Sequence, residues 1–165
     1  MRDIPNVFAD EWEDLFPPIE GWRSKVRRLV APGNDLGMSL YELQPKQTQC
    51  PYHFHHGSDE LILVLRGQLT LRTPGGEREL QAGDVVHFPK GPAGAHHVVN
   101  HSNESTLYVV ASSNVSPEVV EYPDSGKVAA MSRAESQRGE RLWTMHRLDD
   151  AVEYMDGESP RAVNA

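Results

Sequence analysis

The middle of the chain is built from short apolar and β-branched runs separated by turn residues. These runs lie at residues 26–30, 38–43, 52–56, 61–65, 68–73, 84–88, 97–100 and 106–111, with a shorter one near 79–80. Clusters of Gly and Pro at 32–35 and 74–76 mark turns between them. No long amphipathic helical period occurs, so the alternation of strands and helices typical of a doubly wound α/β domain is missing. The pattern predicts an all-β sandwich or barrel with little helix.

Two of these runs, at 61–65 and 107–110, are apolar on both faces. A strand with one face in water should alternate between apolar and polar residues, so the outer side of both runs needs a cover. We expect that cover to come from a second copy of the chain, in a homodimer that exchanges the segment containing Trp12, Phe16 and Trp22. The alternative is a cover within one chain, made by the same segment and a late strand at 142–148.

The length of 165 residues is that of one ordinary domain. Residues 1–24 show no regular period and predict an irregular N-terminal arm. Residues 25–113 hold the series of strands and predict the barrel. Residues 114–165 lose the pattern and predict an extension that packs on the barrel and ends in a polar tail.

Composition narrows the class of partner. Lys and Arg number 16 against 24 Asp and Glu, a formal net charge of −8, which argues against nucleic acid as a partner because phosphate binding needs a clustered positive surface. Cys50 is the single cysteine, so no intrachain disulfide can form. No apolar stretch has the length of a signal peptide or a membrane span, so we expect a cytoplasmic protein that does not bind membranes.

Five of the eight histidines form two clusters, at 53, 55 and 56 and at 96 and 97. On a strand, residues two apart share a face, so His53 and His55 should project together. Glu60 follows after a bend at 57–59, and either His96 or His97 opens a later strand. Three imidazoles and a carboxylate would suit one divalent transition metal (Mn, Fe, Co, Ni or Zn), and would not suit calcium or magnesium.

The spacing of these residues resembles a known family. The stretch His53-x-His55-x4-Glu60-x6-Gly67 is similar to the first motif of the cupin superfamily. The stretch Gly83-x5-Pro89-x-Gly91-x4-His96-x3-Asn100 is similar to the second, with two extra residues between the first glycine and the histidine. The resemblance implies a double-stranded β-helix, the jelly-roll barrel of cupins, with a metal held by His53, His55, Glu60 and His96. The motif spacing to Asn100 selects His96 and turns His97 outward, although the lengthened turn leaves His97 open as an alternative.

Other residues near the motifs have simpler interpretations. Cys50 is expected to be a small buried thiol, His56 a rim or surface group, and His87 an outward neighbour of inward-facing side chains. The segment Glu121–Lys127 resembles one that follows the barrel in some bacterial cupins. It predicts a rigid turn, or a loop over the barrel mouth or at a dimer contact.

The resemblance implies a metal-dependent enzyme that acts on a small polar or anionic metabolite, with isomerase, dioxygenase and decarboxylase chemistry all open. No catalytic residue beyond the metal ligands can be named. The sequence around Glu60 lacks the Arg and Trp of mannose-phosphate isomerases, and a single domain differs from the two-domain oxalate decarboxylases. The alternative is a non-catalytic cupin that binds or senses a small molecule. A DNA-binding regulator is disfavoured, because residues 1–24 do not form a two-helix pattern.

Overall fold

The computed structural model describes residues 4–15, 17, 19–31, 33–135 and 139–159, and regular structure in these is almost entirely antiparallel strand. Within this part of the chain the only helical pieces are three 3₁₀ turns: η1 (Pro92–Gly94), η2 (Pro123–Ser125) and η3 (Leu148–Asp150). No helix among these residues has the length and apolar character needed to cross a membrane. The prediction of an all-β fold with little helix is confirmed.

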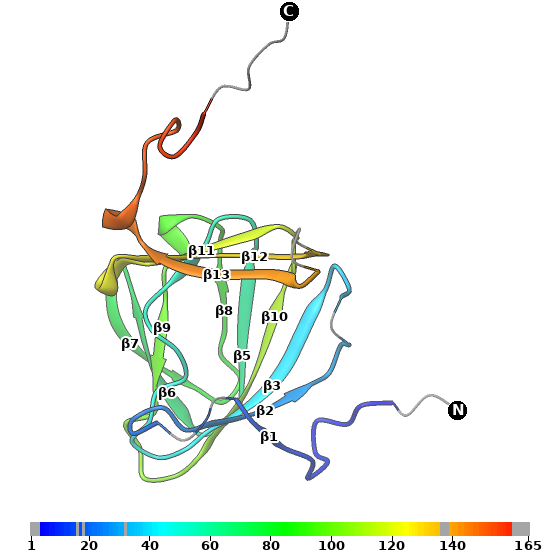
Figure 1. Ribbon diagram of the computed structural model, residues 1–165. Helices are drawn as coiled ribbons and strands as arrows, with labels where there is room; N and C mark the ends of the chain where they lie inside the picture. The colour runs from blue at the N-terminus through cyan, green and yellow to red at the C-terminus, as the bar shows by residue number, and fades with distance from the viewer. Residues whose placement is uncertain (1–3, 16, 18, 32, 136–138, 160–165) are drawn as a thin grey trace, which may run out of the picture.

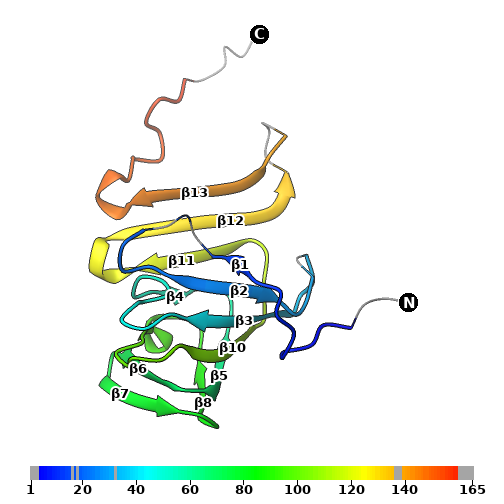
Figure 2. The same ribbon diagram turned by 90° about the horizontal axis from the view of Figure 1, so that it is seen from below.

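The strands form three sheets that together make a barrel (Figure 1). The six-stranded sheet has the order β1 (Glu13–Asp14), β2 (Ser24–Arg28), β3 (Gly37–Leu43), β10 (Thr106–Ser112), β5 (Glu60–Arg66) and β8 (Val85–Phe88). The four-stranded sheet has the order β13 (Arg141–Arg147), β12 (Lys127–Glu135), β11 (Glu118–Tyr122) and β4 (Phe54–His55). The three-stranded sheet has the order β7 (Gly76–Gln81), β6 (Gln68–Thr73) and β9 (His97–Val99). Strands β11 to β13 lie across one end of the barrel, with β13 outermost (Figures 1 and 2).

The barrel interior is an apolar core that follows from strict alternation along the strands. In β5, Ile62 and Val64 are buried, whereas Leu61, Leu63 and Leu65 are half-buried on the outer face. The inner side chains pack with those of the facing strands in one cluster of buried residues: Leu43, Ile62, Val64, Leu69, Leu71, Leu80, Phe88, Val98 and Tyr108. Glu60, two residues before Ile62, therefore starts the inner face of β5 and points its carboxylate into the barrel.

The outer face of the large sheet is covered in part by the chain itself. Buried Leu40, Leu107 and Val109 form a second cluster, and Val7 and Trp12 of the N-terminal arm pack against it, together with Leu29, Met38 and Leu65. Arg27 lies 5.0 Å over the Trp12 ring and donates hydrogen bonds to the carbonyls of Val7, at 2.8 Å, and Ala9. For Trp12 the structure thus has the alternative arrangement, in which the arm covers the sheet of its own chain. Phe16 lies outside the described residues.

Three strands were not predicted: β1 in the N-terminal arm, and β11 and β12 after the barrel. The sequence after residue 113 indicated a single late strand at 142–148, which the structure places at β13 (Arg141–Arg147). Strands β11 and β12 lie between residue 113 and β13 in the sequence. Strand β11 pairs with β4 through Val120↔His55 and Glu121↔Phe54. Three of the nine residues of β12 are Ala, whose weak strand preference is overridden by pairing on both sides.

Candidate metal centre

Two of the predicted ligands face each other across a strand pair. His53 and His96 exchange both backbone hydrogen bonds, with N to O distances of 3.1 and 2.9 Å. Residues paired in this way project their side chains to the same side of the sheet. The two imidazole rings accordingly lie with their centroids 4.6 Å apart.

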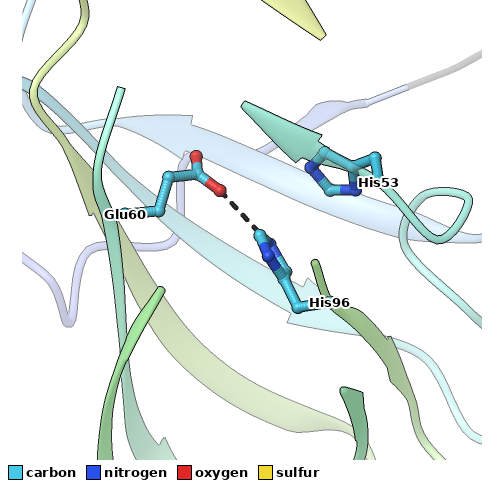
Figure 3. Close-up of side chains that lie close together, drawn as sticks. All are labelled: His53, Glu60 and His96. Atoms are coloured by element: carbon cyan, nitrogen blue, oxygen red, sulfur yellow. Dashed lines mark ion pairs between the residues drawn. The ribbon is translucent and has the colours of Figure 1, made fainter. Parts of the chain in front are cut away.

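Glu60 completes a compact group with these two histidines. One ligand atom each from His53, Glu60 and His96 lies within 4.8 Å of the others (Figure 3). His96 Nε2 lies 3.2 Å from Glu60 Oε2. Ligand atoms bonded to one transition metal at about 2.0–2.2 Å lie roughly 3–4 Å apart, so these separations are suited to a single ion.

His55 approaches the same carboxylate from β4. Its Nε2 atom lies 3.4 Å from Glu60 Oε2, and its ring stands edge-on to that of His53 at 5.2 Å. His55 lies outside the compact group of three. The three predicted histidines are nevertheless gathered around Glu60.

The histidine rings are oriented by contacts at their other nitrogen. Nδ1 of His53 lies 2.8 Å from the carbonyl oxygen of Pro51, and Nδ1 of His96 lies 2.9 Å from that of Gly94. A carbonyl can only accept, so each Nδ1 carries the proton and the neutral ring has its lone pair on Nε2. For His96 that lone pair would face a carboxylate oxygen, an arrangement that needs a cation between them or a second proton on the ring. The donor set therefore fits a bound metal ion.

The protonation states of His53 and Glu60 also suit metal ligands. Burial, aided by the neighbouring His96, lowers the pKa of His53 to about 4, so this ring is neutral at neutral pH. Burial alone would raise the pKa of Glu60, but hydrogen bonds and charge interactions with His55 and His96 outweigh it and lower the pKa. For His55, burial alone would lower the pKa, but the carboxylates of Glu60 and Glu118 outweigh burial, so its pKa is raised.

The remaining histidines of the two clusters point elsewhere. Nε2 of His97 lies 2.6 Å from Thr48 Oγ1, away from the group around Glu60. His56, on the opposite face from His55, lies 3.1 Å from Glu121 and is exposed. His87 is also exposed, 3.7 Å from Asp59, beside the buried Phe88.

Both the barrel and the arrangement of the histidines agree with one family. Residues 39–112 match the model of the cupin domain. These residues form a cupin domain. The resemblance drawn from the two motifs is confirmed, and strands β11 to β13 lie beyond the matched residues.

Several solved structures are similar to this cupin. A candidate sugar phosphate isomerase from Acidithiobacillus ferrooxidans is 26% identical with a TM-score of 0.68, over 81% of each chain. A cupin-superfamily sugar phosphate isomerase from Silicibacter pomeroyi is 24% identical with a TM-score of 0.71, over 92% of this chain and 98% of its own. The polyketide cyclase RemF from Streptomyces resistomycificus is 23% identical with a TM-score of 0.55, over 68% of this chain and 79% of its own. The last two support the fold alone, and no curated protein matches the chain.

Strand β11 brings two residues to the site that the sequence did not reveal. Glu118 is buried, and its Oε2 lies 3.6 Å from Nδ1 of His55. Tyr122 lies nearly parallel to the ring of His53, with centroids 6.0 Å apart. The β-branched pair Val119-Val120, followed by the turn that begins at Pro123, is the sequence signal that could have identified this strand.

The turn after β11 is fastened to the barrel. Arg72 of β6 donates two hydrogen bonds to the Asp124 carboxylate, at 2.6 and 2.9 Å, and lies 4.1 Å over the Tyr52 ring. Gly126 has a φ of 59°, in the left-handed region that favours glycine, where η2 ends and β12 begins. The turn expected within Glu121–Lys127 is thus present at η2. It directly follows Tyr122, whose ring packs on that of His53.

Cys50, expected to be a buried thiol, is half-buried and lies behind His53. Its sulfur lies 3.7 Å from Nδ1 of His53, on the side of the ring that faces away from Glu60. Burial, with a smaller contribution from Glu60, raises the pKa of the thiol to about 12, so it stays protonated. Cys50 does not belong to the compact group of ligand atoms from His53, Glu60 and His96.

A cleft opens beside the metal group. It consists of two adjoining cavities of about 410 and 310 Å³ that share Glu60, Ser112, Asn114, Arg133 and Arg141. The larger cavity also reaches His55 and Glu118, and has an apolar wall of Val115, Met131, Leu142 and Trp143. The smaller one reaches Arg28 and Tyr41. A small metabolite in this cleft would lie against the Glu60 end of the metal group.

Proposed function

We propose that this cupin is a metal-dependent enzyme that acts on a small polar or anionic metabolite. The observation that carries the proposal is the position of His55 and Glu60, which line the larger cavity and belong to the gathering of three imidazoles and one carboxylate. Pockets for small molecules have volumes of roughly 300–1,000 Å³, and the cavity is of that size.

The metal would be held by His53, His55, Glu60 and His96. Nitrogen and oxygen donors in these numbers favour manganese, iron, cobalt, nickel or zinc. Such an ion acts as a Lewis acid on a bound oxygen, or lowers the pKa of a bound water. The chain's own contribution is to orient the rings through Pro51, Gly94 and Glu118, and to keep Glu60 ionised.

Isomerisation of a sugar phosphate is the version that one relative favours, since a candidate enzyme of this kind is 26% identical over 81% of each chain. The sequence around Glu60 lacks Arg and Trp, which counted against this version. The cleft places Arg133, Arg141 and Trp143, distant in sequence, around the cavity that Glu60 lines. Arginine is well suited to phosphate, so the objection drawn from local sequence loses its weight.

The test begins with metal content and continues with turnover. Protein purified without a histidine tag should contain close to one transition metal per chain, and His55→Ala and Glu60→Ala should retain well under half of it. Metal-loaded protein should then interconvert aldose and ketose phosphates, with Glu60→Ala as the control. Full metal content in both variants would contradict the site. Metal and ligand binding without any turnover would favour the alternative of a non-catalytic sensor.

The homodimer, the cytoplasmic location and the exclusion of nucleic acid remain predictions from the sequence.

A further inference from the structure

The outer wall of the cleft comes from a hairpin beyond the residues that match the cupin domain. Strands β12 and β13 pair antiparallel, with Met131 opposite Trp143. In the view of Figure 2, β13 lies at the outer edge of its sheet. From this hairpin the cleft receives Met131, Ser132, Arg133, Arg141, Leu142 and Trp143.

Two arginines of the cleft are held by other groups of the described residues. Arg133 donates to the carbonyl oxygens of Gly33, at 2.6 Å, and Asn114, at 3.1 Å, and lies 3.1 Å from Asp35. Arg28 lies 2.8 Å from Glu13. These contacts tie loops and strands of the protein together. Arg141 is exposed and lines both cavities together with Glu60, so it lies where a ligand that spans them would pass.

The apolar part of the wall is exposed to an unusual degree. Trp143 has 67% of its surface exposed and Leu142 has 39%. Large apolar side chains gathered at a concave surface are typical of ligand sites, and an indole face packs well on rings and other flat apolar surfaces. Trp143 lies two residues from Arg141 on the same strand, so the two side chains can engage one molecule side by side.

We infer that Arg141 and Trp143 form a substrate-binding subsite for an organic anion. The guanidinium of Arg141 binds the phosphate or carboxylate, and Trp143 packs against the ring or apolar face next to it. The remaining polar end of the molecule then extends toward Glu60 and the metal group. This inference rests on the proposed function and deepens it, by naming the substrate class and the residues that select it.

Binding of simple probes tests the subsite without knowledge of the reaction. Titration calorimetry on the full-length, metal-loaded protein compares phenyl phosphate, glucose 6-phosphate, benzoate and inorganic phosphate. At least one organic anion should bind roughly tenfold more tightly than inorganic phosphate, because only it contacts Trp143. Arg141→Gln should weaken every anion by about tenfold or more, since a charge-assisted pair is lost. Trp143→Ala should remove the preference for the organic anions and leave inorganic phosphate unchanged.

Arg147→Gln provides the matched control, because Arg147 is an exposed arginine of the same strand that does not line either cavity. It should bind every probe as the wild-type protein does. The subsite is overturned if no organic anion binds the wild-type protein, if Arg141→Gln binds all probes unchanged, or if Arg147→Gln loses as much affinity. Metal content measured on the same samples separates failure of the subsite from failure of the proposed function. If the protein holds its full metal and Arg141→Gln has no effect on binding, the subsite is excluded and the proposed metal-dependent function is not contradicted.

Discussion

The Oε2 atom of Glu118 faces the Nδ1 atom of His55 at 3.6 Å, and within the described part of the chain neither atom has a hydrogen-bond partner. The other carboxylate oxygen of Glu118 accepts hydrogen bonds from the backbone N–H groups of Gly57 and Val119, both at 2.9 Å. Glu118 is thereby fixed, and a small closing movement would let it accept the Nδ1 proton of His55. The lone pair of His55 would then point from Nε2 toward Glu60.

Glu118 should therefore act as a positioning residue for metal binding. Loss of such a carboxylate behind a histidine ligand costs roughly 10–100-fold in metal affinity, and we expect this for Glu118→Ala. Glu118→Gln retains a hydrogen-bond acceptor and should recover part of the loss. Competition with a chelator measures the affinity, and the absorption spectrum of the cobalt-loaded protein reports whether the ligand geometry has changed.

Glu121→Gln is the appropriate control for this prediction. Glu121 lies on the same strand but contacts the exposed His56 at 3.1 Å instead of His55. It should leave affinity and spectrum unchanged. Equal affinities in Glu118→Ala and the wild-type protein would show that His55 needs no such support.

Substitution of His96 should change the metal content of the protein, whereas substitution of His97 should not. His96 lies 3.2 Å from Glu60, whereas His97 lies 2.6 Å from Thr48 on the other side of the strand. Metal should be lost in His96→Ala and retained in His97→Ala, as measured by elemental analysis of both variants. The reverse result would mean that the lengthened turn at η1 shifts the register by one residue.

The part of the site that follows from sequence is the part encoded by short-range periodicity. His53 and His55 share a face because they are two apart, and Glu60 joins Ile62 and Val64 on the inner face for the same reason. The selection of His96 over His97, and its place beside His53, came from the resemblance to the cupin motifs. Local pattern was sufficient for the all-β class and for the shared faces of His53, His55 and Glu60.

The parts that the sequence did not reveal depend on contacts between distant segments. Glu118 contacts His55 only because β11 adds to β4, a pairing that bridges more than 60 residues and has no local signature. Arg141 and Trp143 reach the cleft only because β12 and β13 form a hairpin, and three of the nine residues of β12 are Ala, which has a weak strand preference. In β12, tertiary pairing overrode weak strand propensity.

Trp12 should contribute to stability by covering the outer face of the large sheet. It packs against the cluster of Leu40, Leu107 and Val109 and beneath Arg27. Removal of this half-buried ring in Trp12→Ala should lower the free energy of unfolding by about 2 kcal/mol, less than the loss typical of a fully buried aromatic. Urea denaturation measures the change. Trp143→Ala, which removes a ring that is 67% exposed, should have little effect, and equal losses in the two variants would contradict the role given to the arm.

The last prediction is the homodimer, and it depends on the outer face that the arm leaves uncovered. Leu61 and Leu63 of β5 remain half-buried on that face, beside Val85 of β8, which is 57% exposed. Burial of a Leu or Val contributes roughly 1.5–3 kcal/mol, so a second copy that covers this row would gain stability. Light scattering at micromolar concentration should give twice the chain mass of 18.5 kDa. Leu61→Lys with Leu63→Lys should shift the mass to that of one chain while the fold, measured by circular dichroism, is retained. A monomeric wild-type protein would show that the outer face of the sheet needs no cover beyond the arm that packs on Leu40, Leu107 and Val109.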